Sequence, residues 1–225
     1  KNFRKELKPR FLKVWLEMLF CFSMIIMPIA TFIVLKINSF YTPLLTLISS
    51  IFIGFWIHAY SCFFHEAAHF NIHRSKKIND LLSNIFITPF TGMLIKNYRL
   101  THWEHHKHLG TRKDTEISYQ SPLSVFKILE IIFCIYHLKV IYRYLKNINF
   151  INKSKSNTSS KTLFVAGLFY VISLHFIFIY FLIFKISIYA GLAWALGLII
   201  FYPIFAFVRQ TLEHRPFGVN SSYQN

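Results

Sequence analysis

The sequence has few acidic residues and few cysteines, and both shortages limit the classes of protein to which the chain can belong. Nine Asp and Glu residues stand against 25 Lys and Arg residues, which gives a formal net charge of +16. Cys21, Cys62 and Cys134 lie in apolar stretches at unrelated spacings, so we expect small buried hydrophobic side chains rather than disulfides or a zinc site. Zinc-finger, Walker and dinucleotide-binding patterns are missing as well.

Apolar residues are abundant. They make up 54% of the 225 residues, Phe alone accounts for 26, and the mean hydropathy is +0.42. This composition predicts a helical membrane protein. The basic residues flank apolar segments, so their expected partner is an acidic membrane surface and not nucleic acid. The first apolar segment is too long for a cleavable signal peptide and has no small-residue cleavage site.

Four segments are long enough to cross a bilayer, which takes about 20 apolar residues. The apolar run from 163 to 208 would be about 70 Å long as one helix, so it must fold back, and Lys185 is the natural turning point. We therefore predict an all-α integral membrane protein with two helical hairpins. We expect the residues between the second and third spans to form a helical cap. The expected spans are residues 14–35, 44–64, 163–184 and 187–208, within a single domain over 1–225.

The distribution of positive charge predicts the orientation. With four spans and both termini on one side, all Lys and Arg residues except Lys36 and Lys185 fall on that side. The positive-inside rule then places both termini and the cap in the cytoplasm. For a bacterial protein this means the inner membrane.

Two further apolar segments lie between the second and third spans. Residues 81–95 are short and interrupted by Pro89 and Gly92, so we expect an interfacial or re-entrant segment. Residues 128–145 are long enough to span but carry four charged or titratable side chains. Such a span would be costly, so we expect an amphipathic helix on the membrane surface.

Five histidines form two clusters in the cap. The first is His65-Glu66-Ala67-Ala68-His69 and the second is His102-Trp103-Glu104-His105-His106. Spacings of three and four residues place side chains on one helical face, and imidazole binds iron, copper and zinc. Two such clusters on one side of a membrane predict a metal site.

The first cluster also fits the zinc protease pattern H-E-x-x-H, with Glu66 as general base. That interpretation leaves the larger second cluster unexplained. It also needs a third, usually acidic ligand, and the later spans contain no acidic residue. It stays open as the minor alternative.

The chain resembles membrane fatty acid desaturases of bacterial type. These enzymes carry three histidine boxes, and the two clusters match the first two. The Asn79-Asp80 pair, the Tyr98-Arg99 pair, the run 109–116 and the segment 209–215 resemble the family too, and the last suggests His214 as a further ligand. No third box follows, so we expect the sequence to be truncated. The metal ligands that the resemblance implies are His65, His69, His102, His105, His106 and His214.

The resemblance implies two non-haem iron ions and O₂-dependent introduction of a double bond into an acyl chain carried by a lipid or coenzyme A. Electrons must come from outside, because the chain has no flavin, haem or iron–sulfur motif. The expected donor is a ferredoxin or a cytochrome b5-like protein. A related hydroxylase or ketolase and a non-catalytic metal or haem carrier stay open. His73 and His108 are weaker candidate ligands, while His58 and His175, within the spans, are expected to be structural. We expect at least one of the neighbouring carboxylates to orient a ligand; the candidates are Glu66, Glu104, Asp114 and Glu213.

Overall fold

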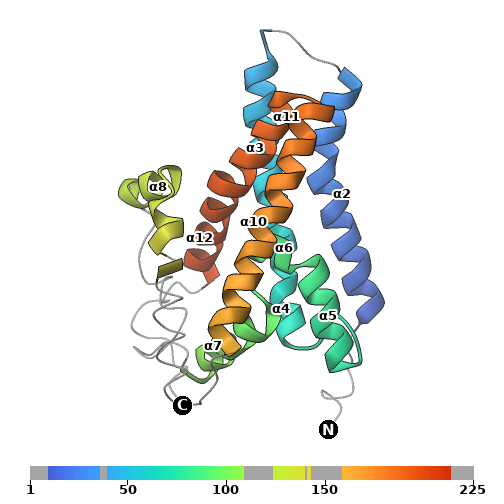
Figure 1. Cartoon of the computed structure of the whole chain (residues 1–225), viewed down its shortest axis with the longest axis vertical. Coiled ribbons are helices and arrows are strands. Elements are labelled where there is room, and N and C mark those ends of the chain that lie inside the picture. The colour runs from blue at the N-terminus through green and yellow to red at the C-terminus, as the bar shows by residue number, and fades with distance from the viewer. Residues whose placement is uncertain (1–9, 36–39, 109–123, 140, 143–158, 214–225) are drawn as a thin grey trace.

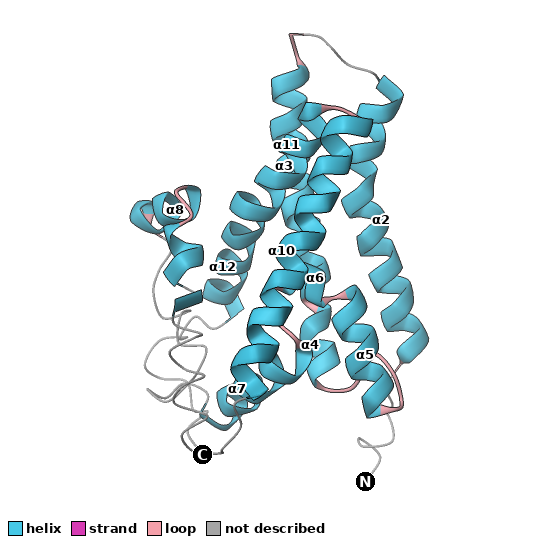
Figure 2. Ribbon diagram, viewed as in Figure 1, coloured by secondary structure: helices cyan, strands magenta, loops and turns pink. Residues whose placement is uncertain are grey.

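The computed structural model describes residues 10–35, 40–108, 124–139, 141–142 and 159–213. Within these residues the regular structure is entirely helical (Figures 1 and 2). Four helical stretches are long and apolar enough to cross a membrane, as the composition predicted. They are Phe11–Val34, Thr42–Ala68, Val165–Lys185 and Ile188–Arg209.

The spans form two hairpins. Helix α2 (Phe11–Leu35) packs against α3 (Thr42–Ser61), and α10 (Ser159–Lys185) packs against α11 (Ile188–Leu196). Lys185 is the last residue of α10, which confirms it as the turning point. The chain continues through a π-helical turn, η2 (Gly197–Phe201), into α12 (Tyr202–Glu213). The end of α2, the start of α3 and the turn between α10 and α11 lie at one end of the bundle (Figure 1).

Helix α3 packs against α2, α11, η2 and α12, and two glycines allow it to approach η2 closely. A Cβ atom on Gly54 would collide with the Cβ of Phe201 and lie 2.9 Å from the carbonyl oxygen of Gly197. A Cβ atom on Gly197 would lie 2.8 Å from Cγ2 of Ile53. The backbones of α3 and η2 can come this close because Gly54 and Gly197 have no side chain.

Short helices gather at the opposite end and form the predicted cap (Figure 1). They are α4 (Phe63–Ala68), α5 (Lys76–Phe86), α6 (Thr88–Thr91) and α7 (Ile95–His108). Residues 81–95, expected to be interfacial or re-entrant, become the end of α5, all of α6 and the start of α7. Pro89 lies in the first turn of α6 and Gly92 ends that helix in the left-handed conformation, with φ 75°.

His175 joins the cap to the spans. Its ring is buried within α10, and its Nδ1 accepts a hydrogen bond from the indole Nε1–H of Trp194, at 3.2 Å. The other nitrogen must then carry the proton, and it donates to the carbonyl oxygen of Pro89 at 2.7 Å. One imidazole therefore ties together α10, α11 and α6, which confirms its structural role.

The amphipathic segment differs from the prediction. A single helix over residues 128–145 was expected, but α8 covers only Val125–Ile132, and helix resumes at residues 135–139. The break falls at Cys134, whose φ of 59° is left-handed and cannot continue an α-helix. An eight-residue helix cannot span a bilayer, and α8 buries Ile131 while Val125 and Phe126 stay exposed. Cys134 is itself exposed, so the expectation that all three cysteines are buried was wrong.

Candidate metal centre

The first histidine cluster lies at the end of a transmembrane helix. Residues Thr42–Ala68 form one long apolar stretch, and His69 caps its end. Phe70 then turns left-handed with φ 62°, while its N–H donates to the carbonyl of Ala67 and the N–H of Asn71 donates to that of Glu66. This pair of bonds is a Schellman ending, here with Phe where Gly is usual. The turn stops the helix just after His69, and the rings of His65 and His69 lie 4.7 Å apart.

The second cluster lies on α7. His102 and His106 are one turn apart, and their ring centroids are separated by 4.5 Å. Tyr98, one turn before, stacks on His102 and on Phe64 of α4. Its hydroxyl oxygen lies 3.5 Å from Nδ1 of His102, which leaves Nε2 of that ring facing the first cluster. Aromatic packing between α4 and α7 therefore brings the two clusters together.

Four histidines meet at this point: His65, His69, His102 and His106. One ring nitrogen from each lies within 4.8 Å of all the others. Nε2 of His102 is 3.1 Å from Nε2 of His69 and 3.0 Å from Nε2 of His106. Nitrogens bound at right angles to one first-row metal ion, at about 2.1 Å each, would lie about 3.0 Å apart. The donor set and its spacing therefore fit a single transition-metal ion.

The environment favours the ligating form of His69. Burial lowers the pKa of His69, and the nearby imidazoles of His65, His102 and His106 lower it further. A neutral imidazole has a free lone pair for a metal, whereas a protonated one has none. The site is thus suited to bind a cation at neutral pH.

Asn79, fully buried on α5, holds the turn that follows the first cluster. Its amide nitrogen donates to the carbonyl of Ala67 at 3.0 Å, and its oxygen accepts from the backbone N–H of Ile72 at 3.1 Å. The carbonyls at the end of α4 have no partners within the helix, so such side-chain donors satisfy them. Asn79 thereby fixes the backbone on both sides of His69.

Arg99 completes this support from α7. Its Nε and Nη2 donate to the carbonyls of Ala68 and Ala67, at 3.0 and 3.1 Å. Its Nη2 and Nη1 also donate to the two carboxylate oxygens of Asp80, at 2.6 and 3.1 Å. The guanidinium lies over the Phe70 ring, 4.0 Å from its centroid. One side chain therefore links α4, α5 and α7 around the histidines. The family resemblance included Asn79, Asp80 and Arg99 but gave them no role. The feature that could have indicated this role is an acidic residue after the first cluster and an arginine before the second.

The four candidate carboxylates have different surroundings. Glu66 lies 3.5 Å from Nδ1 of His65 and accepts a hydrogen bond from Asn71 at 2.8 Å, so it is placed to orient a ligand. Glu104 lies 3.5 Å from Nε2 of His108. The other two, Asp114 and the side chain of Glu213, lie outside the described residues.

The remaining candidate ligands are not in the group of four. His105 is buried on α7, with its ring 6.1 Å from that of His102. His73 accepts a hydrogen bond from the backbone N–H of Ser75, at 2.9 Å, and His108 faces Glu104. His214 lies outside the described residues. Arg209, on the preceding turn of α12, contacts Cys62 at the start of α4 through Nη1.

The fold and this site define a four-span helical membrane protein with a histidine cluster at one end of the bundle. The family model described as fatty acid desaturase matches residues 41–225, which is most of the chain. The chain belongs to the fatty acid desaturase family. No curated protein and no solved structure matches it.

Proposed function

We propose that this protein is a membrane fatty acid desaturase that inserts a double bond into the acyl chain of a lipid or of acyl-coenzyme A. Two adjacent CH₂ groups each lose one hydrogen atom. One O₂ molecule, two electrons and two protons complete the balance and yield two water molecules. The electrons come from an external ferredoxin or cytochrome b5-like protein.

The observation that carries this proposal is the group of four histidines at the end of apolar spans. Iron bound there would supply activation of O₂ for attack on an unactivated C–H bond. The protein's own task is to hold His65, His69, His102 and His106 with their nitrogens convergent. Glu66 orients His65, and Tyr98 orients His102.

A desaturase of this family needs a second iron ion, and we assign His105 and His214 to it. His105 is buried on the same helix as two members of the group but is not one of the four, and its ring lies 6.1 Å from that of His102. The contact between Arg209 and Cys62 supports His214, because it brings the last turns of α12 to the start of α4. Further ligands would come from a third histidine box.

We place the histidine end in the cytoplasm of a bacterial inner membrane. The four-span topology predicts that all Lys and Arg residues except Lys36 and Lys185 belong to that side. Among the described residues, Lys185 lies at the opposite end, where α10 turns into α11. A basic surface at the metal end would also attract an acidic electron donor.

Iron content and product analysis test the function together. The purified protein, loaded with Fe(II) and given reductant, donor, O₂ and a saturated acyl lipid, should form an unsaturated chain detectable by mass spectrometry. His102→Gln should lose iron and product, whereas His105→Gln should retain the ion held by the group of four and lose only the second ion and the product. A protein that turns over without iron would contradict the proposal.

The same assay separates the alternatives. A product that gains an oxygen atom instead of losing two hydrogens would indicate a hydroxylase or ketolase. A zinc protease would cleave protein when zinc is bound. Its proteolytic activity would be abolished by Glu66→Gln and would not change on substitution of His105. A Soret absorption band would indicate a haem carrier.

A further inference from the structure

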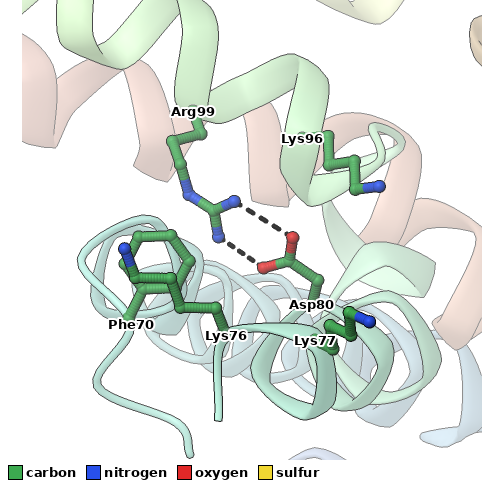
Figure 3. A pocket seen from close by; sticks show the side chains of 6 residues that line it. All are labelled: Phe70, Lys76, Lys77, Asp80, Lys96 and Arg99. Atoms are coloured by element: carbon green, nitrogen blue, oxygen red, sulfur yellow. Dashed lines mark hydrogen bonds and ion pairs between the residues drawn. The ribbon is translucent and has the colours of Figure 1, made fainter. Parts of the chain in front are cut away.

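A basic pocket lies beside the histidine group, between α5, α7 and the turn after α4. It has a volume of about 330 Å³ and is lined by Phe70, Lys76, Lys77, Asp80, Lys96 and Arg99. Figure 3 shows the Arg99–Asp80 pair in its middle, with Phe70 and Lys76 on one side and Lys77 and Lys96 on the other. Phe70 directly follows His69, so this pocket adjoins the candidate metal centre.

The charges of the pocket do not balance. Arg99 and Asp80 neutralise each other through their paired hydrogen bonds. Lys76 lies over the Phe70 ring, 5.0 Å from its centroid. Lys77 and Lys96 are exposed and make no ion pair with any residue that the structure describes. Within the part of the chain that the structure describes, three positive charges therefore surround one small cavity without an anion to neutralise them.

The position of Lys76 and Lys77 adds to this imbalance. Both lie in the first turn of α5, which contains no acidic residue and has no side-chain cap. The N-terminus of a helix carries a partial positive charge, so lysines there are unfavourable unless an anion is present. Free backbone N–H groups at a helix N-terminus also bind phosphate.

The same helix has an exposed apolar face. Ile78, Leu81 and Ile85 share this face of α5 and remain 42%, 58% and 47% exposed among the described residues. In a membrane protein, an exposed apolar face is expected to rest in the interfacial layer, with lysines extending to the headgroups. A bound phosphate would thus sit at headgroup level next to the histidines.

We propose that this pocket binds the phosphate ester of an acyl-bearing molecule, with Lys76, Lys77 and Lys96 as its cationic ligands. A membrane phospholipid is the favoured source, because α5 presents its apolar face to the membrane. The phosphate of coenzyme A has the same chemistry. That the bound molecule is the substrate rests on the proposed function, whereas phosphate binding does not depend on iron or turnover.

Binding to the full chain in neutral detergent tests the pocket. Phosphatidylglycerol is titrated against diacylglycerol with the same chains, which lacks the phosphate; coenzyme A and inorganic phosphate are the soluble probes. Lys77→Gln with Lys96→Gln should weaken binding of phosphatidylglycerol about 30-fold, since each lysine near an anionic lipid contributes about fivefold. Diacylglycerol binding should not change. The Arg replacements at both positions keep the charge and should restore most of the affinity.

The matched control is Lys13→Gln with Lys185→Gln, which removes the same charge outside the pocket. An equal loss in this control would show diffuse surface charge and overturn the proposal. Unchanged phosphatidylglycerol and coenzyme A affinities in the pocket variant would overturn it too, as would a loss confined to binding of an acidic donor protein. A loss of affinity for phosphatidylglycerol identifies a phospholipid as the source of the phosphate, and a loss for coenzyme A identifies coenzyme A. Either loss supports the phosphate site. Iron content, measured in parallel, reports on the metal centre separately.

Discussion

Replacing Arg99 with Met gives the sharpest test of how the histidine clusters are aligned. The guanidinium donates four hydrogen bonds, two to carbonyls at the end of α4 and two to the carboxylate of Asp80. Met has a similar length but no donor. The variant would leave Asp80 without its partner and the carbonyls of Ala67 and Ala68 with fewer donors.

The expected cost follows from burial. Removing one partner of a buried ion pair costs about 3–5 kcal/mol, since the other charge stays desolvated. The side chains of Arg99 and Asp80 are 13% and 14% exposed, so water can reach Asp80 in part. We therefore expect the lower end, about 3 kcal/mol of unfolding free energy. Lys keeps the charge but cannot form the paired hydrogen bonds, so Arg99→Lys should lower the free energy of unfolding by an intermediate amount.

The effect on metal binding is more specific. Arg99 holds the backbone just before His69, so its loss should loosen one helix end relative to α7. Supporting residues around a metal typically contribute about 10–100-fold in affinity, and we expect a weakening of that order in Arg99→Met. The assay is iron retention during titration with a chelator, alongside denaturant unfolding of the metal-free protein.

Arg74→Met is the matched control, because Arg74 is an exposed arginine in the loop between α4 and α5. It should change neither iron retention nor the free energy of unfolding. Equal iron retention in Arg99→Met and the unaltered protein would refute the reasoning, and so would equal loss in both variants.

Three further predictions concern the same framework. Burial alone would raise the pKa of Asp80, but hydrogen bonds from Arg99 and Asn79, together with the positive charges of Arg99 and Lys96, bring it below the usual value. A lowered carboxyl pKa stabilises the fold above the unfolded-state value, about 3.9, and the gain is lost as pH falls through the lower folded-state pKa. The stability difference between the unaltered protein and Asp80→Asn, from unfolding midpoints, should thus be constant at neutral pH and shrink only in strong acid; a decline already near neutrality would contradict this. Gly54→Ala should cost about 1–3 kcal/mol by forcing α3 away from η2, whereas Gly167→Ala meets only the flexible side chain of Leu94, at 3.1 Å, and should be nearly neutral in the same unfolding assay. His175→Leu should cost about 2 kcal/mol by leaving the Pro89 carbonyl and the Trp194 indole without partners; unchanged unfolding would show that the bridge does not stabilise the cap.

The helical architecture could be read from the sequence because it depends on local properties. Runs of about 20 apolar residues are long enough to span, and backbone groups in lipid must be satisfied within a helix. Lys185 interrupts the last apolar run and marks its turn. The histidine spacings were also local, so they indicated that His65 and His69 share one helical face and that His102, His105 and His106 share another.

The break at Cys134 and the left-handed Phe70 could not be predicted, because neither residue type favours that conformation. Phe70 has contacts from beyond its own helix, since Arg99 of α7 and Lys76 of α5 cover its ring.

Sequence alone therefore determined a four-span helical membrane protein with two histidine clusters, and it predicted a metal site on one side of the membrane. Only the tertiary structure decided which histidines converge, that His105 is not among the four, and that Asn79 and Arg99 hold the clusters in register. Spacing along a helix specifies one face of that helix. Which residues of another helix meet that face depends on long-range packing, here the stacking of Tyr98 between Phe64 and His102.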